Sequence, residues 1–172
     1  ARDPAKVATQ PSGTVVKCPG EDVTFTMDAT GTPPLSYQWM KDGVALSGKT
    51  DTSLTVRSLS ATDSGDYYCI VTNDFGVDTT SMATLTMNLV KADITVKDTA
   101  LCLRGNSFQF ISSSTNNLGK FQSILWDLGD KTTANTDTVT HSYNQFDKFQ
   151  VNLLVTSLHN CVDSIIKEIY VW

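Results

Sequence analysis

The segment Asp63–Cys69, which follows Trp39 in the chain, most constrains the fold. Its pattern is Asp-x-Gly-x-Tyr-x-Cys, with Gly65 and Tyr67 in the two middle positions. In an antiparallel two-sheet sandwich, a Tyr two residues before a Cys bonds back to the backbone at the corner where a central strand begins. A Trp on the neighbouring strand packs beneath that Cys. The segment therefore predicts a β-sandwich in the first half of the chain.

The rest of the chain alternates apolar and polar residues, and helix signals are nearly absent. Val23 and Phe25 lie on one face of an expected strand, and Val151 and Leu153 lie on one face of another. Turn sequences such as Asp42-Gly43 separate these runs. Period-2 alternation between turn signals is typical of half-buried strands. We therefore expect an all-β protein.

The length of 172 residues allows two small domains. Trp39 and Trp126 lie about one small sandwich apart, which indicates two sandwiches in tandem. We place the domains at residues 1–90 and 91–172. The join lacks a Gly/Ser-rich linker, so we expect a stiff tandem. We also expect the chain to be part of a longer protein from which any signal peptide has been removed.

Composition excludes several classes of function. The chain has 13 Lys and Arg against 18 Asp and Glu, a net charge of −5, and no basic stripe, so nucleic acid is not an expected partner. No run approaches the roughly 18 apolar residues of a membrane span, so membrane insertion is not expected. The four Cys form no Cys-x-x-Cys pair, which favours an extracellular, disulfide-permitting compartment over a metal site. No cofactor is expected.

Residues 5–88 resemble an immunoglobulin I-set domain. Tyr37-Gln38-Trp39-Met40 is similar to strand C of that family, Leu54-Thr55-Val56 to strand E, and Asp63–Cys69 to the corner and start of strand F. In animal members, strand B carries a Cys that faces strand F, whereas Met27 holds that position here. The resemblance therefore implies a sandwich without the usual inter-sheet disulfide. It is strongest to the immunoglobulin-like repeats of long bacterial surface proteins.

Residues 92–172 resemble a PKD domain. The matching motifs are Trp126-Asp127-Leu128-Gly129-Asp130, His141-Ser142-Tyr143 and the run Phe149–Leu153. Lys131 stands where the family has Gly, and Asp147 stands near another usual Gly. The segment is similar to PKD repeats in very large secreted proteins of gliding gram-negative bacteria, which implies a spacing or adhesive role. Elsewhere such domains accompany chitinases, proteases or collagenases as non-catalytic appendages.

Paired carboxylates and a His invite a catalytic interpretation of the second domain. Asp127 and Asp130 would then be an acid/base pair and His141 a base. We instead predict that the two carboxylates hold backbone N–H groups in a tight turn and that His141 is a structural hydrogen-bonding residue. No nucleophile motif accompanies them, so we predict that the protein is not an enzyme. Weak calcium candidates are Asn116 and Asn117, with Asp127.

The aromatic residues divide into two groups. Trp39 and Trp126 are expected in the cores. Phe75, Tyr170 and Trp172 are candidates for ligand contact, because exposed aromatic rings stack on sugars.

All four cysteines, Cys18, Cys69, Cys102 and Cys161, are disulfide candidates. In a sandwich, the turn after the first strand lies at the end where the chain exits, and the last hairpin lies at the end where it enters. We therefore favour a Cys18–Cys161 bridge that staples the two domains, with Cys102 serving a following repeat. The alternatives are Cys18–Cys69 and Cys102–Cys161.

Our functional hypothesis is a non-catalytic extracellular segment of a large bacterial surface or secreted protein, which spaces other modules and contacts polysaccharide or protein. The partners would be neighbouring repeats and an extracellular ligand. The alternative is an accessory region that targets a secreted depolymerase, such as a chitinase or protease, to its substrate.

Overall fold

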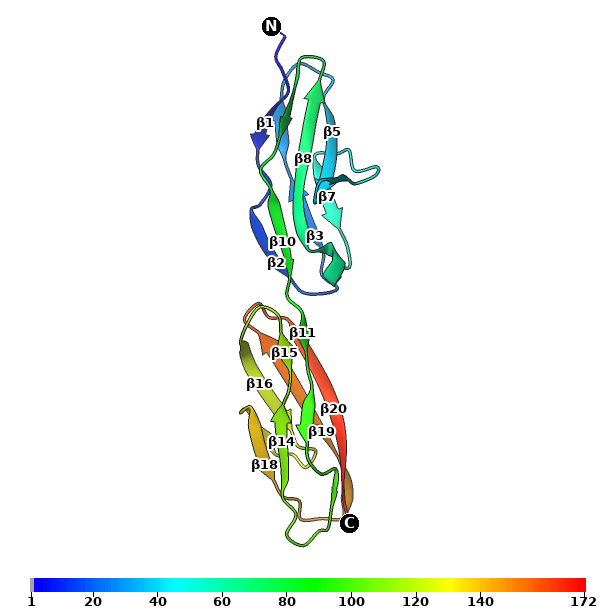
Figure 1. Ribbon diagram of the computed structural model, residues 1–172, viewed down its shortest axis with the longest axis vertical. Coiled ribbons are helices and arrows are strands. Elements are labelled where there is room, and N and C mark those ends of the chain that lie inside the picture. The colour runs from blue at the N-terminus through cyan, green and yellow to red at the C-terminus, as the bar shows by residue number, and fades with distance from the viewer. Residues whose placement is uncertain (1) are drawn as a thin grey trace. The chain divides into compact units, whose positions relative to one another are not determined.

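The structure is a computed structural model that describes residues 2–172 (Figure 1). Strands account for nearly all of its regular elements, and one short 3-10 helix, η1 (Ala61–Asp63), is the exception within the described residues. The chain divides into two compact units between Met87 and Asn88, three residues before the boundary expected from the sequence. The prediction of an all-β tandem of sandwiches is confirmed.

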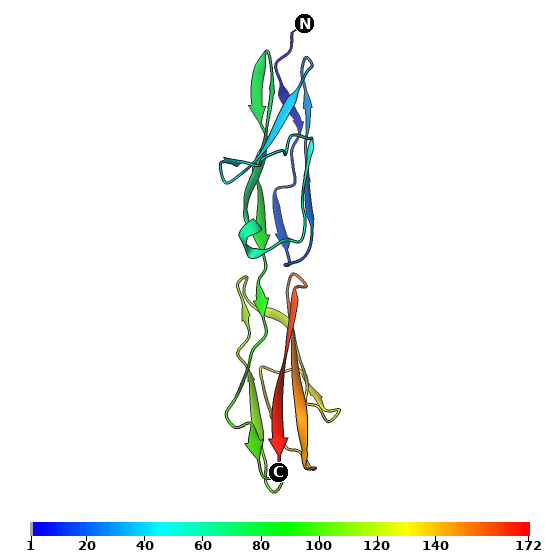
Figure 2. The same ribbon diagram turned by 90° about the vertical axis from the view of Figure 1, so that its right-hand side faces the viewer.

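The first unit contains one broad sheet, faced by two short strand pairs. The broad sheet has the order β2 (Thr14–Lys17), β10 (Ala83–Met87), β8 (Gly65–Asn73), β5 (Ser36–Lys41) and β6 (Val44–Ala45), with β9 (Gly76–Thr79) also beside β8. The facing layer contains β3 (Val23–Thr26) with β7 (Ser53–Val56), and β1 (Lys6–Thr9) with β4 (Asp28–Thr30). Figure 2 shows these two layers from the side.

The core of the first unit lies between its layers. Alternation buries Val23 and Phe25 on β3, and Tyr67, Cys69 and Val71 on β8. Trp39 is fully buried on β5 and is the register partner of Cys69. Met27 belongs to the same buried cluster, so a thioether fills the place of the usual strand-B Cys.

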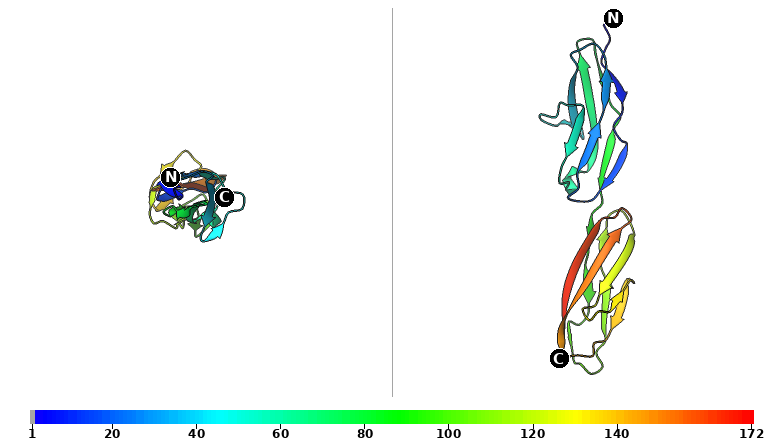
Figure 3. Two further views of the ribbon diagram at one scale, coloured as in Figure 1. Left: turned by 90° about the horizontal axis from the view of Figure 1, so that it is seen from above. Right: turned by 180° about the vertical axis from the view of Figure 1, so that it is seen from behind.

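The second unit also has two layers. Its broad sheet has the order β13 (Ala100–Leu101), β20 (Val162–Val171), β19 (Asp147–Ser157), β16 (Phe121–Asp127) and β17 (Thr133–Ala134). The facing sheet contains β12 (Ile94–Val96), β14 (Phe108–Ser112) and β18 (Thr138–His141), and β11 (Val90–Lys91) pairs separately with β15 (Thr115–Asn116). Figure 3 shows β20, β19 and β16 side by side, in red, orange and yellow-green.

Aromatic residues dominate the second core. Trp126 is fully buried on β16, and its ring lies 6.1 Å from that of Phe110 on β14. Phe108 packs against Phe110 from the same face of β14, with the ring centroids 6.1 Å apart. Val151 and Leu153 on β19 have no exposed surface. This core contains no residue of the first unit, so each sandwich has its own.

The two units share one feature that positions cysteines. In each, a short strand near the start pairs in parallel with the last strand, and the last register pairs are Lys17↔Met87 and Leu101↔Val171. A cysteine follows each short strand directly, Cys18 in the first unit and Cys102 in the second. Both cysteines therefore lie at the end of their unit where the last strand finishes.

Candidate functional site

The turn after β16 carries the two carboxylates of the second unit. Asp127 Oδ1 accepts the backbone N–H of Gly129 at 2.9 Å, and Asp130 Oδ1 accepts that of Thr132 at 3.0 Å. Gly129 has φ +83°, and a Cβ there would lie 2.7 Å from the backbone oxygen of Gln150. Only glycine fits this position, and the two carboxylates serve as turn caps.

Asp130 also pairs with His141, which ends β18. His141 Nε2 lies 2.7 Å from Asp130 Oδ2, and both side chains are largely shielded from water. Burial raises the pKa of Asp130, but the hydrogen bonds from His141 and Thr132 outweigh it and hold that pKa below its usual value. A carboxylate with a lowered pKa is a poor proton acceptor at neutral pH, so the pair stabilises structure.

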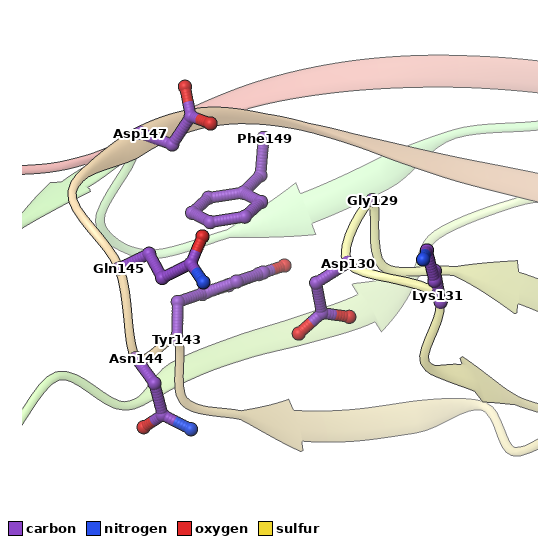
Figure 4. A pocket seen from close by; sticks show the side chains of 8 residues that line it. All are labelled: Gly129, Asp130, Lys131, Tyr143, Asn144, Gln145, Asp147 and Phe149. Atoms are coloured by element: carbon purple, nitrogen blue, oxygen red, sulfur yellow. The ribbon is translucent and has the colours of Figure 1, made fainter.

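A pocket of about 460 Å³ opens beside this pair (Figure 4). Its floor is Tyr143, whose ring stacks on Phe149 with centroids 4.1 Å apart and whose hydroxyl donates to Leu128 O at 2.7 Å. Burial raises the pKa of Tyr143, so the phenol stays protonated. Gln145 points toward the stacked rings, whereas Asp147 points away from them (Figure 4).

The pocket does not assemble a reactive centre. The hydroxyl of Tyr143 donates to a backbone carbonyl, and Asp130 is bound by His141 and Thr132. Across residues 2–172 there is no group of three or more His, Cys, Asp or Glu that could hold a metal ion. The hydrogen bonds of Tyr143, Asp130 and His141 therefore fix a loop.

The calcium candidates are not brought together. Asn116 Oδ1 accepts the Asn88 amide at 2.6 Å, and Asn117 Oδ1 accepts the backbone N–H of Leu89 at 2.7 Å. Asp127 lies at the far end of β16, about 20 Å of strand away at ~3.3 Å per residue. The amide oxygens of Asn116 and Asn117 therefore serve the loop before β16, and the carboxylate of Asp127 serves the turn after it.

The three candidate ligand-contact aromatics are all exposed. Phe75 lies in the turn between β8 and β9, 39% exposed, with the Arg2 guanidinium 5.7 Å from its ring centroid. Tyr170 is near the end of β20, and Trp172 follows that strand directly. Phe75 belongs to the first unit, and the other two belong to the second.

Sequence reasoning missed an apolar surface on the outer face of the second broad sheet. Leu125 on β16 is the register partner of Leu154 on β19. Ile166 on β20 lies diagonal to Leu154, because its register partner is Asn152, two residues before Leu154. Leu125 and Ile166 are about half exposed. The signal was present, because each of these residues follows another apolar residue and so breaks the alternation. We call Leu125, Leu154 and Ile166 the outer-sheet patch.

One polar atom at this patch lacks a partner. Asn152 lies opposite Ile166 on one side and Asp127 on the other. Within residues 2–172, its Oδ1 is shielded from solvent and has no hydrogen-bond partner. A shielded acceptor without a hydrogen-bond partner is rare in native proteins.

A second missed surface surrounds Cys102. Leu103, Arg104, Phe146 and Trp172 line a shallow hollow of about 500 Å³ with Cys102. Phe146 and Trp172 are 71% and 66% exposed. Because these residues come from three separate segments, the sequence pattern could not show that they meet. We call this set the C-terminal hollow.

The cysteines differ in state. Cys69 is buried and Cys102 is exposed, and both are free thiols, so the alternatives Cys18–Cys69 and Cys102–Cys161 are wrong. Cys18 and Cys161 are each disulfide-bonded. Burial raises the pKa of the Cys69 thiol, which makes it unreactive.

The signature of the first unit is structural. The hydroxyl of Tyr67 donates to Asp63 O at 2.8 Å, which closes the corner before β8. Trp39 Nε1 donates to Asp51 O at 2.9 Å, and Trp126 Nε1 in the second unit donates likewise to Thr136 O at 2.8 Å. Burial raises the pKa of Tyr67 to about 12, so its hydroxyl remains a donor.

Family models match both units. A model described as an immunoglobulin domain matches residues 4–73, and one described as a PKD domain matches residues 91–171. The chain is an immunoglobulin-like domain followed by a PKD domain. From here we call the first unit the immunoglobulin-like domain and the second the PKD domain.

Curated relatives resemble the immunoglobulin-like domain. The cell adhesion molecule DSCAM of Homo sapiens is 34% identical over 88 residues, which cover 45% of this chain and 4% of that protein. Hemicentin-2 of Mus musculus is 35% identical over 74 residues, 39% of this chain and 2% of that protein. The chain thus spans only a few per cent of the length of these relatives.

Solved structures share the fold. The I-band fragment I67–I69 of titin has a TM-score of 0.66 and 18% identity, covering 99% of this chain and 66% of that one. The N-terminal four immunoglobulin domains of Dscam1 isoform 6.9 have a TM-score of 0.57 and 18% identity, covering 100% and 47%.

Together these comparisons show two tandem β-sandwich domains, one immunoglobulin-like and one PKD, and a fold shared with titin and Dscam1. No helix within the described residues is long and apolar enough to cross a membrane.

Proposed function

We propose that this chain is a non-catalytic extracellular segment of a large bacterial surface or secreted protein, and that its PKD domain binds a protein ligand. One contrast carries the proposal. The polar signature residues of the PKD domain are engaged in internal hydrogen bonds, whereas the outer-sheet patch turns aliphatic side chains to solvent. Contiguous exposed apolar surface on a sheet is typical of an interaction site.

The chemistry of the patch favours a protein over a polysaccharide. Leu125, Leu154 and Ile166 are branched aliphatics, which pack against other apolar side chains. Sugar recognition depends on aromatic rings. The exposed aromatic residue on this face of β20 is Tyr170, which is not one of the three residues of the outer-sheet patch.

Two features support the bacterial and extracellular parts of the proposal. Met27 replaces the strand-B Cys of animal immunoglobulin domains, and no Asn-x-Ser/Thr glycosylation site occurs in the sequence. Disulfide-bonded Cys18 and Cys161 fit an oxidising compartment.

We further propose that Cys18 and Cys161 bridge each other and hold the domains together. The two cysteines lie in segments that contact the two residues of the domain junction, Met87 and Asn88. Lys17, beside Cys18, is the register partner of Met87. Ser157 Oγ accepts the backbone N–H of Cys161 at 3.1 Å and lies 2.5 Å from Asn88 Oδ1. Since Met87 and Asn88 are consecutive, both cysteines belong to the segments that flank the junction.

A binding screen tests the ligand. The purified chain is presented to extracellular proteins such as collagen, to polysaccharides including chitin and cellulose, and to whole bacterial cells, with and without calcium. We expect saturable binding to a protein or cell surface, weakened at least roughly tenfold in the double variant Leu125→Ser, Ile166→Ser. The matched control Val77→Ser removes an aliphatic residue that is 65% exposed in the immunoglobulin-like domain and is expected to have no effect.

Two outcomes would contradict this assignment. Polysaccharide binding abolished by Tyr170→Ala or Trp172→Ala would replace the outer-sheet patch with an aromatic sugar site. Co-sedimentation with chitin or cellulose would favour the accessory region of a depolymerase. Non-reducing peptide mapping tests the bridge separately, and any linkage other than Cys18–Cys161 refutes it.

A further inference from the structure

We infer that the C-terminal hollow of the PKD domain docks a second β-sandwich unit, and that Cys102 forms a disulfide with a cysteine in the last hairpin turn of that unit. This inference rests on the proposed Cys18–Cys161 bridge. The proposed occupant is a sandwich domain that carries a cysteine at the position of Cys161, between its last two strands.

The first observation is the equivalence of Cys102 and Cys18. Each follows a short strand that pairs in parallel with the last strand of its domain, one residue beyond the pairs Leu101↔Val171 and Lys17↔Met87. Cys18 is disulfide-bonded, whereas Cys102 is an exposed free thiol. Cys102 therefore occupies in the PKD domain the position that Cys18 occupies in the immunoglobulin-like domain.

The second observation concerns the last hairpins. In the PKD domain, the turn between β19 and β20 ends at Cys161. In the immunoglobulin-like domain, the corresponding turn between β8 and β9 contains Asp74 and Phe75 and no cysteine. The last hairpin of the immunoglobulin-like domain therefore offers no thiol, and Cys102 of the PKD domain is a free thiol. We therefore expect the cysteine after the short parallel strand of one domain to bond to a cysteine in the last hairpin of the next domain.

The third observation is independent of the cysteines. Phe146 and Trp172 are largely exposed, and they meet Leu103 around Cys102 in a hollow lined mainly by carbon. Exposed aromatics beside a reactive thiol are costly on a free surface, and a docked neighbour would bury them. Trp172 follows Val171 as Asn88 follows Met87, so the hollow lies where a following domain would begin.

The covalent step is a thiol–disulfide exchange with a small-molecule disulfide such as oxidised glutathione. The Cys102 thiolate attacks one sulfur of the oxidant and releases one reduced thiol. The partner's thiolate then attacks the mixed disulfide at the Cys102 sulfur and releases the second thiol. The two cysteines lose two protons and two electrons, which reduce the oxidant to two thiols.

A three-domain chain tests the inference. A second copy of residues 88–172 is joined after Trp172, which keeps every residue of the C-terminal hollow; the PKD domain has its own core. The added copy carries Cys102→Ser, so that Cys102 comes from the first PKD copy alone, and Val162→Ile, at a residue 62% exposed, so that its Cys161 peptide has a distinct mass. After refolding with reduced and oxidised glutathione, non-reducing tryptic mapping should find most of Cys102 linked to the added copy.

Matched variants separate geometry from general reactivity. Cys102→Ser with Thr99→Cys keeps an exposed thiol in the same peptide and should give roughly tenfold less linkage, because disulfides require Cα atoms within ~7 Å. Phe146→Ser should slow linkage several-fold if the hollow docks the neighbour. Equal linkage in the Thr99→Cys variant, or an unchanged rate in Phe146→Ser, overturns the corresponding part of the inference.

The same digest separates two failures. If Cys18 is linked to the first Cys161 while Cys102 is recovered as a free thiol, only the present inference fails. If Cys18 is not linked to Cys161, the proposed bridge fails, and the direction of pairing fails with it.

Discussion

The immunoglobulin-like and PKD domains fasten the same corner by different means. In the immunoglobulin-like domain, Gly20 N donates to Leu59 O at 2.7 Å and Leu59 N donates to Glu21 O at 2.8 Å, so backbone groups join the first turn to the later corner. In the PKD domain, the Asn106 side chain accepts Tyr143 N at 2.7 Å and donates to Tyr143 O at 2.8 Å. At this corner of the PKD domain, the side-chain amide of Asn106 thus makes the hydrogen bonds that backbone groups make in the immunoglobulin-like domain.

The tyrosines show a second difference. Tyr67 bonds to Asp63, four residues upstream, and closes one corner. Tyr143 bonds to Leu128, fifteen residues upstream, and ties its loop to the turn after β16. Each domain has a buried Tyr, but only the PKD domain uses it across the sandwich. The PKD domain therefore depends more on individual side chains, and the following variants test that dependence.

The largest effect is expected for Asn106→Ala. It leaves the N–H and C=O of Tyr143 and the C=O of Leu103 without their partner, and each unsatisfied buried group costs about 1–3 kcal/mol. We expect the free energy of unfolding of the PKD domain to fall by about 3 kcal/mol. Asp22→Ala in the immunoglobulin-like domain loses two exposed bonds, from Ser58 N and from the Arg57 guanidinium, which water can replace, and should cost about 1 kcal/mol. Urea titration read by hydrogen exchange of each domain measures both. Equal losses would remove the contrast between the domains.

The tyrosine hydroxyls come next. Tyr143→Phe leaves the buried Leu128 carbonyl unpaired, and we expect a loss of about 2 kcal/mol. Tyr67→Phe should cost about 1 kcal/mol, because Asp63 is nearer to solvent and water can replace the hydroxyl. Thermal unfolding monitored by calorimetry gives the two values. A larger loss for Tyr67→Phe would reverse the proposed order.

Two residues with left-handed backbone conformations should respond differently to substitution by glycine. Lys131 has φ +75° with an exposed side chain, so Lys131→Gly should stabilise the PKD domain by about 1 kcal/mol. Asp42 has φ +50°, but its carboxylate accepts Asp66 N at 2.8 Å, so Asp42→Gly should give no net gain. Chemical denaturation of both variants measures the difference. Stabilisation by Asp42→Gly would show that its hydrogen bond contributes little.

The smallest effect is a pH dependence in the PKD domain. The pKa of Asp130 is lowered in the folded state, so its contribution to stability is present above the unfolded pKa of about 4. That contribution is lost as pH falls through the lower folded pKa. We expect Asp130→Asn to be less stable than the parent at pH 7 and to show a shallower loss below about pH 4. Parallel acid-unfolding profiles for the two proteins would contradict the prediction.

The sequence predicted the structural roles of the signature residues because those roles depend on local spacing. Asp127 and Gly129 lie two residues apart, as a side-chain-capped turn requires. Tyr67 lies four residues from its acceptor. Local spacing carries less information about Asn116 and Asp127, the weak calcium candidates. A seven-residue strand, β16, separates their surroundings.

What the sequence by itself determined is the set of strands, their buried faces and the two core tryptophans, because strand alternation fixes which side chain turns inward. Only the tertiary structure decided which outward-facing residues meet. Leu125 gains Leu154 as a neighbour through strand register, and Cys102 gains Phe146 through the approach of separate loops. Those encounters depend on pairing between distant segments, for which local periodicity carries no information.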